Sequence, residues 1–321
     1  MRQAIRFYRQ RSEAPVDPLS DLVALLRPHD CVAAGLDAGG DWSVRFERHA
    51  GLKCNAVVDG ACWLAVENEG PIRLDAGDCA ILPHGRPFLL SSHPARTGRD
   101  ADAVYAPARH GGTATYGGGG AFFMVGSRFL LSGPGADMIL RTLPAVMVVR
   151  AGPDGAAVRW ALRRMAEELR DPRPGGRLSI AHLAHFIFVQ TMRCHLERQR
   201  PEPGGRLAAM ADPRIAPAVA AMHDAPARAW TVEALARRVG MSRTSFAARF
   251  RHIAGETPMG YLTRWRMLLA ADRLRHTQMP VARIAAEVGY GSESAFAAAF
   301  KRETGQTPRG YARGKDAATS S

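Results

Sequence analysis

The chain has 321 residues, of which 46% are hydrophobic and 23% charged, and its formal net charge is +13. This composition is that of an ordinary globular protein long enough for two domains. No apolar run approaches the roughly 18 residues that cross a bilayer, and the basic first ten residues lack the apolar core of a signal peptide.

The cysteines and the charge distribution narrow the setting further. The five cysteines are spaced irregularly, and no signal peptide is evident, so we expect a cytoplasmic protein with reduced thiols. Because no apolar run is long enough to cross a bilayer, we expect no membrane partner. Residues 213–321 hold 17 Lys/Arg and 8 Asp/Glu, a net charge of +9, whereas the first 212 residues carry only +4. A concentration of positive charge near the C-terminus is typical of a domain that binds phosphates.

The N-terminal segment is expected to hold one short helix. Residues 1–16 are interpreted as a tail, and Asp17-Pro18 reads as an N-cap followed by the first helical position. Leucines and a valine at helical spacing continue to residue 26, and Pro28 ends the pattern.

From about residue 30 to 131 the sequence changes to short alternating runs, which predict strands. Turn residues such as Asp59-Gly60 and Gly77-Asp78 separate them. Closely spaced strands of this kind indicate a sandwich or a barrel. The predicted strands are Trp42–Phe46, Asn55–Val58, Ala61–Val66, Pro71–Leu74, Cys79–Leu82 and Ala121–Val125. Residues 94–120, rich in Gly, Ala and Arg, are expected to form a long flexible loop.

The next region is predicted to be helical. Val158, Leu162, Met165 and Leu169 lie at helical spacing, and a second apolar face runs through residues 179–199. The segment Pro201-Glu-Pro-Gly-Gly205 is short and rich in Pro and Gly, which is typical of an interdomain linker.

The C-terminal third contains one pattern written twice. Residues 231–261 and 280–311 share a spaced set of apolar, Gly and Pro positions, with an offset of 49 that becomes 50 after the turn. Thr231 reads as an N-cap, Gly240 as a helix end, and Ser242 as the cap of a second helix. A short helix, a Gly-containing turn and a second amphipathic helix predict a helix–turn–helix, here used twice. Two helical hairpins in an ordinary α-domain are the alternative interpretation.

These residues also carry a family resemblance. Residues 213–313 resemble the DNA-binding domain of AraC/XylS-type transcription regulators, through a late signature that includes Val288-Gly289-Tyr290, Phe296, Gly305 and Thr307-Pro308. The resemblance implies two helix–turn–helix units joined by a linker helix, which would run from Pro258 to His276. It also implies double-stranded DNA as a partner, with RNA polymerase as a candidate further partner.

The strand region is similar to the cupin fold. Gly60 followed by Cys62-Trp63-Leu64, and the frame of Gly77, Pro83 and Gly85, carry this resemblance. Metal-binding cupins place histidines where Lys53 and Phe88 stand here, and neither side chain supplies the nitrogen or oxygen donors that Fe, Mn or Zn require. We therefore expect no metal, no cofactor and no catalysis; a cupin enzyme fused to a DNA-binding domain is the less favoured alternative. His49, His84 and His93 lie near these positions but not at them.

Together these patterns predict an α+β protein with a defined domain order. It comprises a tail (1–16), a cupin-like sensor domain (17–135), a helical region (136–200), a linker (201–211), an AraC-type DNA-binding domain (212–313) and a second tail (314–321). In proteins of this arrangement the helical region usually pairs two subunits, so we expect a homodimer. The alternative is that these helices only cover the barrel.

The residues expected to read DNA follow from the helical repeat. If Phe246 and Phe250 face inward, the opposite face of the same helix is free, and the resemblance places that face in the major groove. Arg243 could bind guanine through two hydrogen bonds, and Glu293 could accept one from cytosine. The full set of expected DNA contacts is Ser242, Arg243, Thr244, Ala247, Ala248, Arg249, Arg251, Arg264, Arg266, Ser292, Glu293, Ser294, Ala297, Lys301 and Arg302. Of these, Arg249, Arg251, Arg264, Arg266, Lys301 and Arg302 are the expected phosphate contacts.

Two hypotheses describe what the N-terminal half senses. The favoured one is a small-molecule effector that binds the cupin-like domain. The other is oxidation of Cys31, Cys54, Cys62 or Cys79, of which Cys62 and Cys79 are expected to lie close together. The alternative for these two cysteines is that they are small buried hydrophobic residues.

Overall fold

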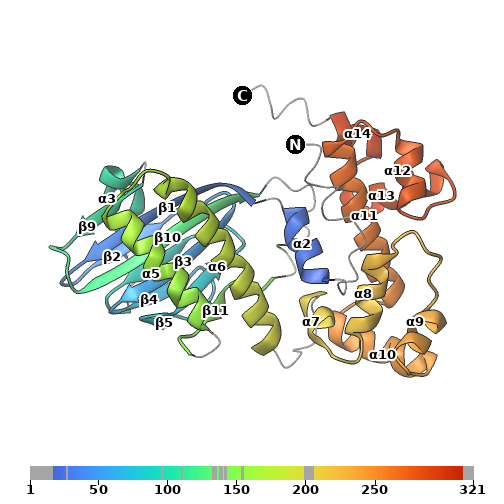
Figure 1. Cartoon of the computed structure of the whole chain (residues 1–321), viewed down its shortest axis with the longest axis horizontal. Coiled ribbons are helices and arrows are strands. Elements are labelled where there is room, and N and C mark those ends of the chain that lie inside the picture. Colours follow the sequence, from blue (N-terminus) through green and yellow to red (C-terminus); the bar gives the residue numbers. More distant parts are fainter. Residues whose placement is uncertain are drawn as a thin grey trace. The chain divides into compact units, whose positions relative to one another are not determined.

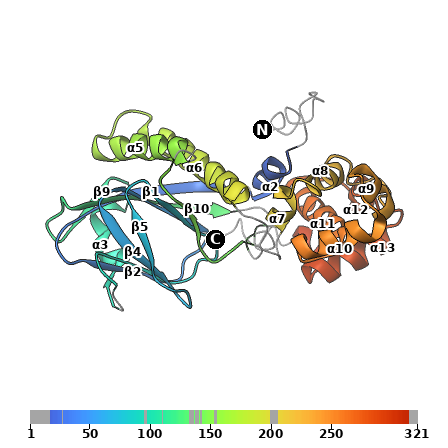
Figure 2. The same ribbon diagram turned by 90° about the horizontal axis from the view of Figure 1, so that it is seen from below.

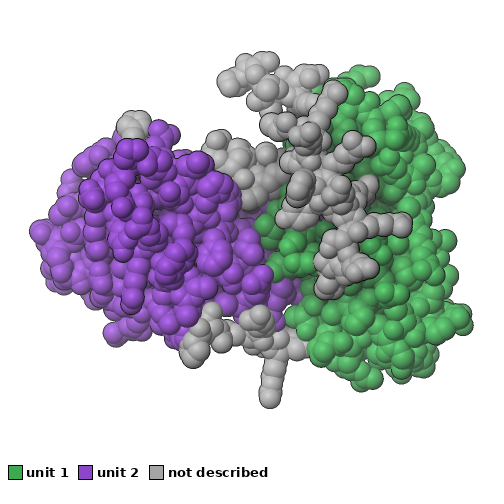
Figure 3. Space-filling view, in the orientation of Figure 1, with its two compact units in different colours: residues 1–24, 208–321 green, residues 25–207 purple. Residues whose placement is uncertain are grey.

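A computed structural model describes residues 17–26, 28–94, 97–109, 111–131, 136, 140, 143–152, 155–198 and 206–313 (Figure 1). The chain divides into two compact units (Figure 3). One comprises residues 25–207, and the other comprises residues 1–24 together with 208–321. The predicted tails 1–16 and 314–321 and the linker core 201–205 lie outside the described residues.

Two sheets form the cupin-like unit. The larger sheet has the strand order β11-β6-β3-β10-β1-β9, and the smaller has the order β5-β4-β7-β2-β8. The larger sheet consists of β1 (Pro28–Ala38), β3 (Leu52–Asp59), β6 (Cys79–Leu82), β9 (Thr113–Tyr116), β10 (Phe122–Leu131) and β11 (Met147–Val149). The smaller sheet consists of β2 (Ser43–Phe46), β4 (Ala61–Val66), β5 (Ile72–Asp75), β7 (Phe88–Ser91) and β8 (Arg99–Asp100).

The inner faces of the two sheets form the core of this unit. Alternate residues of each strand point inward, as the period of two requires. Phe46, Leu64 and Leu90 of the smaller sheet meet Leu36 and Met124 of the larger one, all of them buried. A strand is thus present in each segment where alternation predicted one.

Two helices cover the outer face of the larger sheet. Helices α5 (Ala156–Arg170) and α6 (Gly176–Arg198) pack against each other and against β1, and they lie along one side of the sheets in Figure 2. The second helix was expected to begin near residue 179 and begins at Gly176 instead. Strand β11 lies inside the region 136–200 that was predicted to be helical, because Met147–Val149 pairs with β6.

The prediction of a long loop over residues 94–120 is wrong. This segment contains β8, helix α3 (Ala101–Val104), a 3-10 turn η1 (Ala106–Ala108) and β9. The carboxylate of Asp100 accepts a hydrogen bond from the backbone N–H of Asp102 at 2.8 Å and so caps α3. Strand β9 adds to the edge of β1 in parallel register, a long-range pairing that local composition does not reveal.

The C-terminal part of the other unit is entirely helical. Its helices are α7 (Arg206–Ala211), α8 (Ala216–Asp224), α9 (Val232–Arg238), α10 (Arg243–Ala254), α11 (Pro258–His276), α12 (Val281–Glu287), α13 (Glu293–Thr304) and α14 (Pro308–Arg313). Helix α11 matches the predicted linker helix to the residue, whereas α7 lies inside the segment predicted to be linker.

Helix α11 joins two separate hydrophobic cores. Tyr261 and Leu262, from its first half, pack in the core around Phe246 and Phe250. Met267 and Leu274, from its second half, pack in the core around Phe296 and Phe300. Each helix–turn–helix therefore has a core of its own.

The N-terminal helix α2 (Pro18–Leu26) begins as predicted, because the carboxylate of Asp17 accepts hydrogen bonds from the N–H groups of Leu19 and Ser20. Residues 17–24 group with the DNA-binding helices. Asp21 Oδ2 of α2 lies 3.4 Å from Nδ1 of the buried His223, whose ring stacks on Trp265 with a centroid distance of 3.8 Å. Among the helices within the described ranges, none combines the length and apolar character needed to cross a membrane.

Candidate functional site

Side-chain caps and glycines set the two helix–turn–helix units. Ser242 Oγ accepts a hydrogen bond from the N–H of Ser245 at 3.2 Å, and Ser292 Oγ accepts one from Ala295 at 3.3 Å, so each second helix begins at a matched cap. Gly240 in the first turn has a φ of 65°, a left-handed conformation that favours glycine. The two copies thus fold by the same local chemistry.

The inward faces of α10 and α13 are occupied by phenylalanine. Phe246, Phe250, Phe296 and Phe300 are all fully buried. The residues expected to read DNA consequently lie on the remaining surface of these helices. Ser242, Arg243, Thr244, Ala248, Arg251, Ser292, Ser294, Lys301 and Arg302 are exposed, while Ala247, Glu293 and Ala297 are half-buried.

Four of the expected phosphate contacts donate to their own chain, one of them, Arg302, to the adjacent Glu303 at 3.4 Å. Arg249 binds Asp212 through Nε at 3.2 Å and Nη2 at 2.6 Å. Arg264 donates to Glu256 at 2.9 Å through Nε. Arg266 donates to the carbonyl oxygens of Pro226 and Arg228 at 2.7 and 2.9 Å, and so ties α11 to the loop before α9.

Glu293, the expected cytosine contact, pairs with Arg309 at 3.3 Å, and the side chains of the two residues are 41% and 74% exposed, respectively. Such a surface pair is worth little in water and can open when a base competes for the carboxylate. Arg243 and Arg251 are exposed at the two ends of the outward face of α10. Within the described ranges, no carboxylate oxygen lies within 4.0 Å of either of these two arginines.

The positions that hold histidine in metal-binding cupins lie inside the sandwich here. Lys53 Nζ of β3 lies 4.1 Å from the centroid of the Phe46 ring and 5.0 Å from that of Phe88, on the opposite sheet. Burial, followed by the charge of Lys53, lowers the pKa of His49 to about 4. His84 instead contacts the carbonyl oxygen of Leu140 at 2.8 Å through Nε2. No three His, Cys, Asp or Glu side chains gather as a metal site in the part of the chain that the structure describes.

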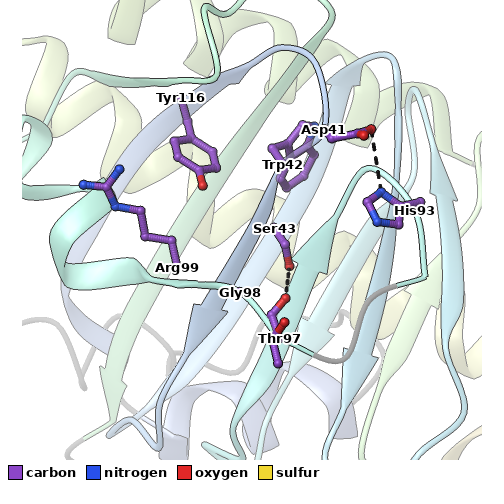
Figure 4. A pocket seen from close by; sticks show the side chains of 8 residues that line it. All are labelled: Asp41, Trp42, Ser43, His93, Thr97, Gly98, Arg99 and Tyr116. Atoms are coloured by element: carbon purple, nitrogen blue, oxygen red, sulfur yellow. Dashed lines mark hydrogen bonds and ion pairs between the residues drawn. The ribbon is translucent and has the colours of Figure 1, made fainter.

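A separate pocket of about 420 Å³ opens beside β2 and β8 (Figure 4). Ser43 Oγ donates to the carbonyl oxygen of Thr97 at 2.9 Å, and the Arg99 guanidinium lies 5.9 Å from the centroid of the Tyr116 ring. The lining residues are Asp41, Trp42, Ser43, His93, Thr97, Gly98, Arg99 and Tyr116. The pocket is open to solvent and offers both charges and an aromatic face to a small polar molecule.

The cysteines are arranged differently from the expectation. Cys62 belongs to the smaller sheet and the inner core, whereas Cys79 belongs to the larger sheet and contacts Thr191 of α6. Cys79 Sγ lies 3.2 Å from Cys54 Sγ instead, and both residues are buried. The contact with Cys79, followed by burial, raises the pKa of Cys54 well above its ordinary value.

Burial also favours the protonated form of Cys31 and Cys62. Burial raises the pKa of Cys31 to about 12 and that of Cys62 to about 12. Thiolate is the reactive species, so thiols with raised pKa values react slowly.

Two large apolar side chains are exposed on the helices that cover the larger sheet. Trp160 of α5 is 62% exposed and Leu178 of α6 is 63% exposed. The inward sides of the same helices are filled by residues such as Leu162 and Phe188. A tryptophan left in water beside an otherwise packed helix is typical of a surface that another molecule covers.

Comparison with known proteins gives matches to both units. Residues 17–197 match a family described as Cupin, and residues 235–314 match one described as Helix-turn-helix domain. A protein of Streptomyces antibioticus, described as an AraC-like transcription regulator, is 42% identical over 282 residues, which are 87% of this chain and 93% of that protein. One of Streptomyces lividans with the same description is 41% identical over 87% of this chain and 92% of its own length. The HTH-type transcriptional regulator AlkR of Acinetobacter baylyi is 29% identical over 80% of this chain and 86% of its own.

Proposed function

The chain belongs to the AraC-like DNA-binding transcription regulators, and from this premise we propose that its cupin-like domain binds a small-molecule effector that alters DNA binding by a homodimer. The observation that carries the DNA-reading part is the matched pair of helices α10 and α13. Each buries two phenylalanines and leaves its other face to solvent.

Base reading is assigned to the exposed N-terminal turns of these two helices. The Arg243 side chain is long enough to contact a base edge, and its guanidinium carries the two donors that bind guanine. The phosphate contacts are assigned to Arg251, Lys301 and Arg302, which are exposed. Arg249, Arg264 and Arg266 bind partners in other segments of the domain and are better suited to positioning its helices. Arg302 pairs with its chain neighbour Glu303, and its side chain is 66% exposed.

Effector binding is preferred over thiol oxidation and over catalysis. The raised pKa values of Cys31, Cys54 and Cys62 oppose rapid oxidation of these thiols. Lys53 and Phe88 supply no ligand set for a catalytic metal, and the relatives at 41–42% identity are described as regulators rather than enzymes. An effector can act as a switch only if it binds the two DNA-binding states with different affinity.

Sequence-specific DNA binding is expected for the full chain and should weaken steeply with salt. Each phosphate neutralised by Lys or Arg releases counterions, so about six such contacts lower affinity about 10³-fold between 50 and 200 mM salt. Selection from a random DNA pool would supply the target, and fluorescence anisotropy at several salt concentrations would measure the slope. Failure to enrich any sequence would contradict the proposed function.

Replacement of Arg243 by alanine is expected to relax sequence preference at one base pair. Loss of a bidentate contact costs about 1–3 kcal/mol of discrimination. Arg302→Ala is the matched control: it removes an exposed charge of the other helix and should lower affinity nearly equally on all sequences. Parallel selections with wild type and the two variants separate the outcomes. An unchanged preference for Arg243→Ala would show that this face does not read bases.

The homodimer is assigned to the exposed apolar side of α5 and α6. Replacement of Trp160 by serine is expected to weaken dimerisation by at least about 2 kcal/mol, or roughly 30-fold, because a central tryptophan is a common hot spot. Sedimentation velocity over a concentration series measures the effect. Val32→Ser, which removes an exposed apolar side chain of β1, is the control. Equal effects of the two substitutions would place the dimer contact elsewhere.

A further inference from the structure

Two basic side chains lie side by side at one end of the sandwich, with Lys53 half-buried and Arg128 exposed. Lys53 of β3 and Arg128 of β10 are direct partners in an antiparallel pair, so their side chains project from the same face of the larger sheet. Lys53 Nζ lies over the rings of Phe46 and Phe88, which belong to the inner core of the opposite sheet. The shared face is therefore the inner one.

No carboxylate neutralises this pair at close range. In the ranges that the structure describes, no Asp or Glu oxygen lies within 4.0 Å of the Lys53 or Arg128 nitrogens. Burial, followed by the charge of Arg128, lowers the pKa of Lys53 to about 8, and only the exposed Asp102 opposes this shift. Like charges on directly paired strand positions repel, and the neighbouring His49 is neutral because its pKa is about 4.

A buried amide adds an unused donor beside the two cations. Asn55 lies two residues along β3 from Lys53, hence on the same face, and is only 3% exposed. Its Nδ2 has no hydrogen-bond partner among the described residues. A buried donor without an acceptor is costly and rare in native proteins, so it calls for an acceptor.

Aromatic rings surround the basic end. The rings of Phe46 and Phe88 stack with centroids 4.4 Å apart, and the Tyr105 ring lies 5.9 Å from that of Phe46. Val32, the partner of Arg128 on β1, is 44% exposed at the edge of the same face. Positive charge and N–H donors are thus combined with an apolar wall.

We propose that Lys53, Arg128 and Asn55 bind the carboxylate of a small organic acid whose apolar body packs against Phe46 and Phe88. The carboxylate supplies the acceptors that the amide and the two cations lack, and it removes their mutual repulsion. The apolar wall favours an acid with a hydrophobic body over a bare anion. This inference rests on the proposed effector-binding function and gives the effector its chemical class.

Calorimetric titration of the full chain would test the ligand class. The probes are acetate, butyrate and phenylacetate as carboxylates, 2-phenylethanol and 2-phenylethylamine as neutral and cationic matches, and inorganic phosphate as a bare anion. Butyrate or phenylacetate should bind more tightly than acetate and phosphate. Neither the neutral 2-phenylethanol nor the cationic 2-phenylethylamine should bind. Binding of none of the carboxylates, or equal binding of 2-phenylethanol or phosphate, would overturn the proposal.

Substitutions would locate the site. Lys53→Met and Arg128→Met keep the length of the side chain without its charge, and each should weaken carboxylate binding at least about tenfold. Arg45→Met removes an exposed arginine of β2 that pairs with Glu47, and should leave binding unchanged. Circular dichroism checks the fold of each variant. Wild-type affinity in a folded Lys53→Met variant would overturn the assignment.

Proton uptake on binding supplies a second, independent measurement. A carboxylate beside Lys53 favours its charged form, so binding near pH 8 should take up a proton from the buffer. The measured heat should therefore differ between phosphate and Tris buffers, whose ionisation heats differ. Lys53→Met should lose this difference, whereas Arg128→Met should retain only part of it, because loss of the Arg128 charge raises the pKa of Lys53 in the free protein. Binding heats independent of the buffer at pH 8 would contradict the role of Lys53.

DNA affinity measured on the same samples separates this inference from the function on which it rests. If a carboxylate binds through Lys53 and DNA affinity does not change, the site stands and effector control fails. If DNA affinity responds to a ligand equally in wild type and Lys53→Met, effector control stands and the site assignment fails.

Discussion

Replacement of Phe300 by alanine is expected to destabilise the second helix–turn–helix by about 3–5 kcal/mol while leaving the first nearly unchanged. Phe300 is fully buried, and its ring centroid lies 5.6 Å from that of Phe296 and 5.4 Å from that of Tyr311. Alanine leaves a cavity between α13 and α14. Because the first helix–turn–helix has a core of its own, its helices α9 and α10 lose no contact.

Amide hydrogen exchange resolves this prediction by region. Exchange in α12, α13 and α14 should accelerate in Phe300→Ala far more than exchange in α8, α9 and α10. Phe300→Leu, which preserves most of the volume, should cost less than about 1.5 kcal/mol. DNA affinity should fall with the folded fraction of the second unit. Equal acceleration in both units would show that the two cores unfold together.

Replacement of Asp212 by alanine is expected to destabilise the first helix–turn–helix, which contains its partner Arg249, by about 3 kcal/mol. The Asp212 carboxylate, which is 1% exposed, accepts hydrogen bonds from Arg249 and from the N–H groups of Arg214 and Ile215. Alanine removes the acceptor of two N–H groups in the turn before α8 and leaves Arg249 without its counterion. Chemical denaturation measures the loss. The Arg249→Ala variant and the double variant complete a cycle that isolates the ion pair.

The contribution of Asp212 should depend on pH. Burial raises its pKa, but hydrogen bonds from Arg249, Arg214 and Ile215 and the charge of Arg249 outweigh burial, so the pKa lies below its ordinary value of 3.8. A lowered pKa in the folded state means that the carboxylate stabilises the fold above about pH 4. This stabilisation is lost as pH falls through the folded-state pKa. The difference between wild type and Asp212→Ala should be constant from pH 5 to 7 and shrink below pH 4.

The DNA-binding helices could be predicted closely because their signals are local. Thr257 accepts a hydrogen bond from the N–H of Gly260, Pro258 follows at the first helical position, and the apolar face repeats until His276. The cap residues Ser242 and Ser292 lie three residues before the N–H groups they bind. Signals of this kind span a single turn of helix and can be read from the sequence alone.

Long-range pairings account for what the sequence did not reveal. Strand β1 carries no clear alternation, and its extended form depends on pairing with β10 and β9. Arg249 lies on the outer surface of α10, as expected for a phosphate contact, but its partner Asp212 lies 37 residues earlier in the chain. The sulfur contact of Cys54 depends in the same way on the register of β3 with β6.

Helix α11, which is shared by the two helix–turn–helix units, also limits which mutations the DNA sites of this protein can accumulate. Its 19 residues span about 28 Å, less than one turn of the duplex, which is about 34 Å. Because one continuous helix contributes to both cores, the distance between α10 and α13, to which base reading is assigned, is fixed. A single inserted base pair would rotate the second recognised segment by about 36° around the duplex, out of reach of its helix. Among the DNA sites that one copy of the chain binds, we therefore expect base substitutions. We expect no insertions or deletions between the segments read by α10 and α13.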